Sequence, residues 1–140
     1  MASIYPEIRA ALETKLSNIS GIPDIAYENV SYSPTTGQSF VQPRLIPVSR
    51  RAAVRGLNPQ HRYEGVFRVF CYVPEGSGPA AADALADKVV DAFETSTDIS
   101  FTNTDLETIK VTVDYAERDN GFVDSPWYYV AVNVGWYAYA

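Results

Sequence analysis

The chain has 140 residues, which suits a single domain, and its 46% hydrophobic and 20% charged residues are typical of a globular protein. One cysteine excludes an internal disulfide, and one histidine, His61, excludes a catalytic triad or metal cluster built on histidine within one chain. No apolar stretch approaches membrane-spanning length, so the sequence predicts a soluble, intracellular protein of one domain, residues 1–140.

The net charge of −6 is unevenly distributed along the chain. Residues 44–68 hold six arginines against one glutamate, a balance of +5, whereas residues 75–107 hold eight acidic residues against one lysine, a balance of −7. Two interpretations remain open. Each segment is a solvated face, or the two segments meet between subunits.

An amphipathic helix is predicted over residues 4–19, because apolar side chains recur every four residues. Gly21 and Pro23 end it. A short strand is expected at 24–30, followed by a turn-rich loop at 31–39. The next strand, at 40–48, contains Pro43 and Pro47, which cannot donate to a ladder, so we place it at a sheet edge.

Residues 49–62 form a polar, Arg-rich connection without a clear period, and we interpret it as a long loop that is mobile in the free subunit. The strand after it, at 63–73, alternates strictly, and a helix follows at 79–94. This strand and helix are expected to organise the core. The predicted core residues are Phe67, Val69, Leu85, Val89, Phe93, Val111, Val113, Val130 and Val132.

Residues 95–104 are predicted to be a polar loop, and residues 106–115 to be a strand. Asn120-Gly121 is a strong hairpin signal, so a turn is expected at 116–125. The last strand, at 127–140, has an apolar even-numbered face and an aromatic odd-numbered face.

These elements predict an α+β fold in the order α-β-β-β-α-β-β, with a mostly antiparallel sheet and both helices packed on one face. The other face would be only partly covered. It would carry the aromatic side chains of Phe70, Tyr72, Trp127, Tyr129, Tyr137 and Tyr139.

Motifs with catalytic or ligand-binding chemistry are weak in this sequence. Cys71 lies on the apolar strand face and is interpreted as a buried thiol. Asp83, Asp87 and Asp91 share one helix face, where solvation is a simpler role than cation binding. Glu75-Gly76-Ser77-Gly78 lacks the ending of a phosphate loop. We therefore expect no cofactor, no metal and no enzyme activity.

The arginines raise nucleic acid as a partner, but a pI of about 4.6 is low for a dedicated binder. A basic patch lining a channel through an oligomer stays open, because assembly can concentrate such charge.

The sequence resembles a known family in three places. These are Ala26-Tyr27-Glu28-Asn29-Val30 with the following Pro34, the run from Tyr63-Glu64-Gly65 through Tyr72-Pro74-Gly76-Gly78, and the Ala/Asp-rich helix after it. Together they resemble the small tail-terminator or tail-completion proteins of long-tailed, double-stranded DNA bacteriophages. The resemblance extends from about Ile4 to the last strand.

The resemblance implies an α+β virion protein that forms a hexameric ring at the head-proximal end of the tail tube. Its implied partners are its own copies, the major tail tube protein and a head-completion or connector protein, with DNA passing through the channel. The alternative is a small α+β accessory binding module or enzyme. Candidate subunit-interface or channel residues are Arg44, Arg50, Arg51, Arg55, Arg62, Asp83, Asp87, Asp91, Trp127, Tyr129, Tyr137 and Tyr139.

Overall fold

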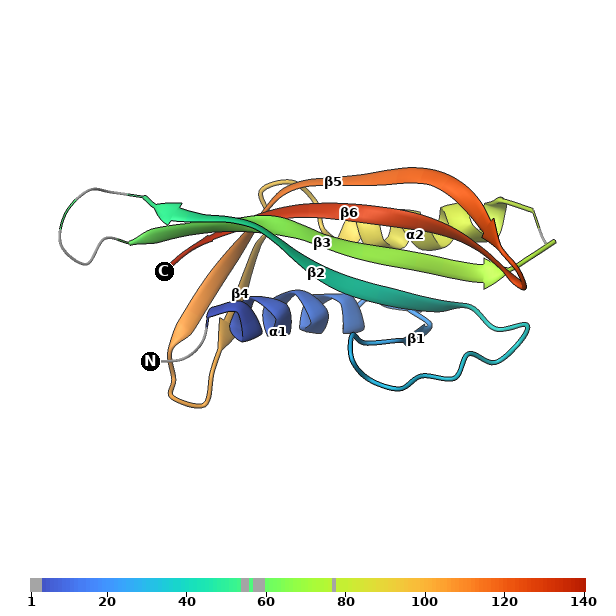
Figure 1. The fold of residues 1–140 in the computed structure, drawn as a ribbon, viewed down its shortest axis with the longest axis horizontal. Coiled ribbons are helices and arrows are strands. Elements are labelled where there is room, and N and C mark those ends of the chain that lie inside the picture. The colour runs from blue at the N-terminus through green and yellow to red at the C-terminus, as the bar shows by residue number, and fades with distance from the viewer. Residues whose placement is uncertain (1–3, 54–55, 57–59, 77) are drawn as a thin grey trace.

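The computed structural model describes residues 4–53, 56, 60–76 and 78–140. These residues form two helices and six strands (Figure 1). In chain order the elements are α1 (Ile4–Ser17), β1 (Asp24–Ile25), β2 (Phe40–Ala52), β3 (His61–Pro74), α2 (Ala80–Ala92), β4 (Asp98–Thr102), β5 (Thr108–Asp124) and β6 (Trp127–Tyr139).

The strands form one curled sheet in the order β1-β2-β3-β6-β5-β4, in which only the short β1–β2 pair is parallel. Both helices pack against the same face of this sheet, which we call the core face (Figure 1). The predicted α+β class, the mostly antiparallel sheet and the helices on one face are confirmed. The order differs from the prediction by one additional strand.

The core forms where the inward side chains of β3 and β6 meet the apolar stripes of α1 and α2. Alternation along β3 is complete, because odd-numbered residues from Tyr63 to Val73 are buried and even-numbered ones are half-buried. Every predicted core residue lies in this cluster, with Phe67 and Phe93 packed at a ring distance of 5.9 Å.

The prediction of a loop at 95–104 is wrong for its middle part, because β4 occupies residues 98–102. Ile99 pairs with Val111 and Phe101 with Ile109, and both side chains contact the core. Two apolar residues in a five-residue strand are too few to establish a period. Tertiary burial, rather than local pattern, makes this segment a strand.

The predicted turn at 116–125 is also wrong over most of its length, because β5 continues to Asp124 and the chain reverses at Ser125-Pro126. The register shifts between Arg118 and Gly121, so Asn120-Gly121 lies in a β-bulge rather than in a hairpin turn. A Cβ on Gly121 would lie 1.7 Å from the Tyr128 hydroxyl oxygen. This glycine therefore allows a tyrosine to cross the strand rather than making a turn.

The loop predicted at 49–62 is wrong at both ends. Residues 49–52 belong to β2 and pair with His61–Glu64 of β3, so the two strands form a long hairpin that projects beyond both helices (Figure 1). Arg50 and Arg51 consequently lie in a strand. Arg55, another predicted site residue, lies outside the described residues.

Candidate assembly surface

Among the described residues, no helix covers the sheet face opposite α1 and α2, and we call this face the open face. A band of aromatic side chains crosses it at one end. Tyr129 lies at the centre of this band, with ring distances of 5.1 Å to Tyr72, 5.9 Å to Phe70 and 5.8 Å to Phe122. Phe122 is 53% exposed, so the band presents apolar area to solvent.

Trp127 belongs to a small second core. It is 9% exposed and packs edge-on against Phe40 at 5.2 Å, with Ala26 in the same cluster and Tyr32 against it. The segment after β1 thus covers this end of the open face. Trp127 was predicted as a subunit-interface or channel residue; within one subunit it packs in this cluster, and its role in assembly stays a prediction.

Arginines occupy the middle of the open face, on neighbouring strands. Arg44 pairs in register with Arg68, and the Arg68 guanidinium forms an ion pair of 3.0 Å with Asp119. Arg44 is exposed, with its guanidinium carbon 6.0 Å from the Phe70 ring centre. Only Arg44 of these two was predicted as a site residue.

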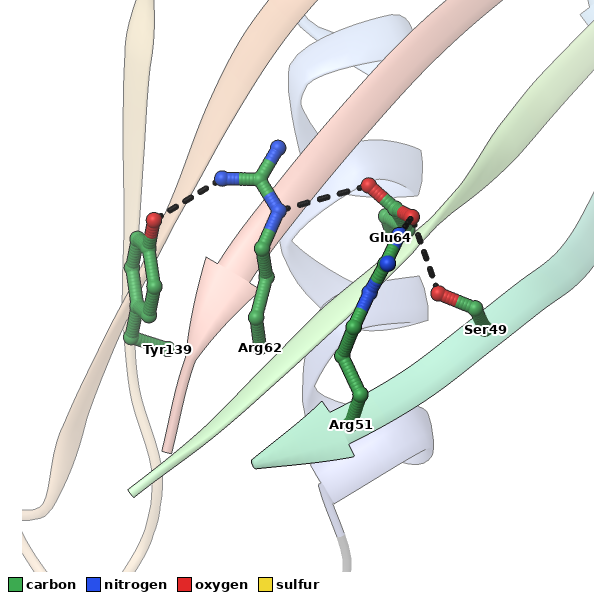
Figure 2. Close-up of polar contacts among 5 residues, drawn as sticks. All are labelled: Ser49, Arg51, Arg62, Glu64 and Tyr139. Carbon is green, nitrogen blue, oxygen red and sulfur yellow. Dashed lines mark hydrogen bonds and ion pairs between the residues drawn. The ribbon is translucent and has the colours of Figure 1, made fainter. Parts of the chain in front are cut away.

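A polar network centred on Glu64 lies at the other end of the open face (Figure 2). One Glu64 oxygen accepts hydrogen bonds from Arg51 Nη2 at 2.6 Å and Ser49 Oγ at 2.9 Å, and the other accepts from Arg62 Nε at 3.3 Å. The hydrogen bonds from Arg51, Ser49 and Arg62 lower the pKa of Glu64 to about 2. The carboxylate is therefore ionised throughout the ordinary pH range.

Arg62 connects this network to the last strand. Its Nη1 donates to the Tyr139 hydroxyl at 2.8 Å (Figure 2). Its guanidinium carbon lies 4.2 Å from the Tyr137 ring centre. The structure therefore brings together four predicted site residues: Arg51, Arg62, Tyr137 and Tyr139.

Arg50 lies apart from this network because neighbouring strand residues point to opposite faces. Its Nε donates to the Tyr63 hydroxyl at 3.0 Å on the core side, and the Tyr63 ring packs edge-on against Tyr5 at 5.5 Å. These two contacts fix the base of the β2–β3 hairpin from the side opposite the Glu64 network.

The predicted acidic residues on α2 divide into two groups. Asp83 forms an ion pair of 2.5 Å with Arg118 of β5 within the same subunit. Asp87 and Asp91 are exposed to solvent. Among the described residues, Asp87 and Asp91 form no ion pair, so these two leave a negative surface on α2.

Sequence reasoning missed Glu64, Arg68, Asp119 and Phe122 as members of this surface. Glu64 carried a usable signal, since it is the single acid among six arginines in residues 44–68. The partnership of Arg68 with Asp119 had no local signal, because 51 positions separate the two residues.

The residues that the structure describes offer neither a metal-binding cluster nor a reactive cysteine thiolate. The described part of the chain contains no group of three or more His, Cys, Asp or Glu residues placed to hold a metal ion. Burial raises the pKa of the Cys71 thiol to about 12, so its nucleophilic thiolate form is suppressed. Within the described residues, neither helix has the length and apolar character that crossing a membrane requires.

Comparisons with known proteins give a family and a fold. One solved protein structure, which carries no functional name, is 19% identical with a TM-score of 0.71, covering 99% of this chain and 97% of its own; at that identity it supports the fold alone. No curated protein matches the chain. The family model described as "Phage tail terminator protein" matches residues 7–136, which is most of the chain. The chain therefore belongs to the phage tail terminator family and is a structural protein of a phage tail.

Proposed function

We propose that this protein assembles into a closed ring, expected to be hexameric, that caps the head-proximal end of the phage tail tube. The observation that carries the proposal is the family match over residues 7–136. The open face supports it, because an aromatic band with Phe122 half-exposed is suited to contact another protein surface.

In this role the ring ends polymerisation of the major tail tube protein and presents the finished tail to a head-completion or connector protein, which joins tail to head. Assembly takes place in the host cytoplasm, and the ring stays in the virion of a siphovirus-type phage. These steps require rigid contact surfaces and no chemistry, which agrees with a structural family.

DNA that passes through such a ring needs a channel whose wall does not bind it strongly. Among the arginines, Arg51 and Arg62 share Glu64, and Arg68 is paired with Asp119. This pairing reduces the net positive potential of the open face. We propose that DNA passes without sequence-specific contacts.

The alternative, a small accessory module or enzyme, has no specific observation in its favour. The two functions differ in how the protein acts: an accessory module or enzyme would act as a free subunit, whereas a terminator acts by capping tubes.

The test adds the purified protein to tail tube protein that is polymerising in solution, and measures tube length by negative-stain electron microscopy. We expect a ring-shaped cap at one end and shorter tubes as the protein concentration rises, because capped ends stop growing. Bovine serum albumin at equal concentration is the control. Tubes of unchanged length without caps would overturn the proposal.

A further inference from the structure

The edge of β2 that faces away from β3 is blocked over its first half, beginning where β1 pairs with Phe40 and Val41. Backbone groups of alternate strand residues face the same side, and on the outer side Val41 O accepts from Ala26 N at 2.8 Å while Leu45 N donates to Glu28 Oε1 at 2.5 Å. The outward positions between and after them are Pro43 and Pro47, which have no N–H. From Val41 to Pro47 this edge therefore offers no free donor to another strand.

Glu28 is itself held in place for this task. An ion pair of 2.7 Å from Arg9 of α1 fixes its carboxylate beside the Leu45 amide. An engaged amide and two prolines at successive outward positions form the pattern by which proteins prevent unwanted edge-to-edge pairing.

Blocking stops at the irregularity between Pro47 and Ser49, where the strand changes phase. Beyond it Ala53 N donates to Gln60 O at 2.7 Å, so odd-numbered residues face β3 and the backbone groups of Arg50 and Ala52 face outward. Within the described part of the chain, these outward groups have no recorded partner and no proline interrupts them. We call Val48–Ala52 the arm edge.

The arm edge is held by side-chain and backbone contacts although it projects beyond the helices. The Glu64 network fixes Ser49 and Arg51 on the open face. His61 and Ala140 exchange two backbone hydrogen bonds, of 2.8 and 3.0 Å, so the end of the chain pairs with β3 on the side away from β2. A rigid edge loses little conformational entropy when a strand adds to it.

The opposite edge of the sheet, β4, is also open. Asn103 N donates to Glu107 O and Val113 N donates to Thr97 O, both at 2.9 Å, so odd-numbered residues face β5. Asp98, Ser100 and Thr102 thus direct their backbone groups outward. In the described residues, β4 pairs with β5 alone.

The two open edges are complementary in charge and apolar character. The arm edge carries Val48, 65% exposed, together with exposed Arg50. The turn after β4 carries Leu106, 84% exposed, between exposed Asp105 and Glu107.

We propose that the arm edge of one subunit adds as a strand to β4 of a second copy of this chain. The proposal rests on the proposed ring. Two different edges of one molecule make a head-to-tail interface, which closes into a ring when the rotation between subunits permits. Main-chain hydrogen bonds supply affinity, and the opposite charges favour the correct register.

Substitution at Ser100 tests the proposal, since Ser100→Pro removes an outward N–H while Ser100→Ala keeps it. We expect Ser100→Pro to raise the protein concentration needed for ring formation by at least about tenfold, because it removes backbone hydrogen bonds from each interface. Ser100→Ala should assemble like the wild type. Light scattering and negative stain measure both.

Cross-linking keeps the proposal testable even if Ser100→Pro fails to fold. Ala52→Cys and Ser100→Cys subunits are mixed under ring-forming conditions and treated with a short bis-maleimide linker. The native Cys71 is buried and should not react. We expect covalent dimers in the mixture and none with either variant alone.

The outcomes separate the two proposals. Wild-type rings without cross-linked dimers, and with a folded Ser100→Pro variant that assembles normally, would overturn strand addition and leave the ring. A wild-type protein that forms no ring, alone or on tubes, would overturn the proposed function itself.

Discussion

At the scale of single residues, Glu64 shows how one acid organises a basic segment. Its carboxylate accepts from Arg51, Ser49 and Arg62, which come from the two paired strands β2 and β3. The sequence placed these residues in or beside a mobile loop, because their partnership depends on strand register rather than on local period. A lone acid among arginines was the one local signal available.

Glu64→Gln should lower protein stability at neutral pH, because the neutral amide loses charge-assisted bonds. The folded pKa of Glu64, about 2, lies below the usual 4.5, so its stabilising effect is complete above about 4.5 and is lost as pH falls towards 2. The gap in urea midpoint between wild type and Glu64→Gln should therefore be constant down to about pH 5.5 and shrink below 4.5. Glu117→Gln is the control, because Glu117 is an exposed carboxylate on β5 of the same sheet. A gap that stays unchanged from pH 7 to pH 3 would contradict this role.

At the scale of elements, the sequence predicts long periodic segments well and short or interrupted ones poorly. The strict alternation of β3 and the apolar stripe of α2 needed no tertiary information. Helix α1 was predicted two residues too long, and the strand expected at 24–30 is β1, which ends at Ile25. Strand β5 was cut short at a turn signal, because the close approach of Tyr128 to Gly121 depends on the neighbouring strand.

Helix α2 provides the test of the core at this scale. Val89 is fully buried against the sheet, so Val89→Asp places an unpaired carboxylate in an apolar site. Such burial costs several kcal/mol, comparable with the ~5–15 kcal/mol stability of a whole domain. We expect Val89→Asp to be largely unfolded by circular dichroism. Ala84→Asp, on the exposed side of the same helix, should melt like the wild type. Equal melting of both variants would contradict the assigned packing.

At the scale of the whole molecule, ion pairs within the subunit neutralise part of the charge of the two segments, residues 44–68 and 75–107. Arg68, Arg51 and Arg62 are paired internally, and Asp83 is paired with Arg118. The uneven charge was visible in the sequence. Which charges stay available could not be predicted, since that depends on the strand order and on which residues face the same side. Arg44, Arg50, Asp87, Asp91, Asp105 and Glu107 are among the exposed charges that assembly could use.

A charge swap distinguishes the two acidic surfaces that could face Arg50 of a neighbouring subunit. Arg50→Glu should raise the concentration needed for ring formation a few-fold, because an exposed ion pair contributes about 0–1 kcal/mol and like charges would then face each other. Adding Asp105→Lys and Glu107→Lys to the same chain should restore assembly. Adding Asp87→Lys and Asp91→Lys instead should not, because those residues belong to α2 and not to β4 or the turn that follows it. Light scattering at low and high salt measures each variant, and the differences should shrink as salt screens the charges. Restoration by the α2 pair alone would move the interface from the β4 edge to the helix, while leaving the ring itself intact.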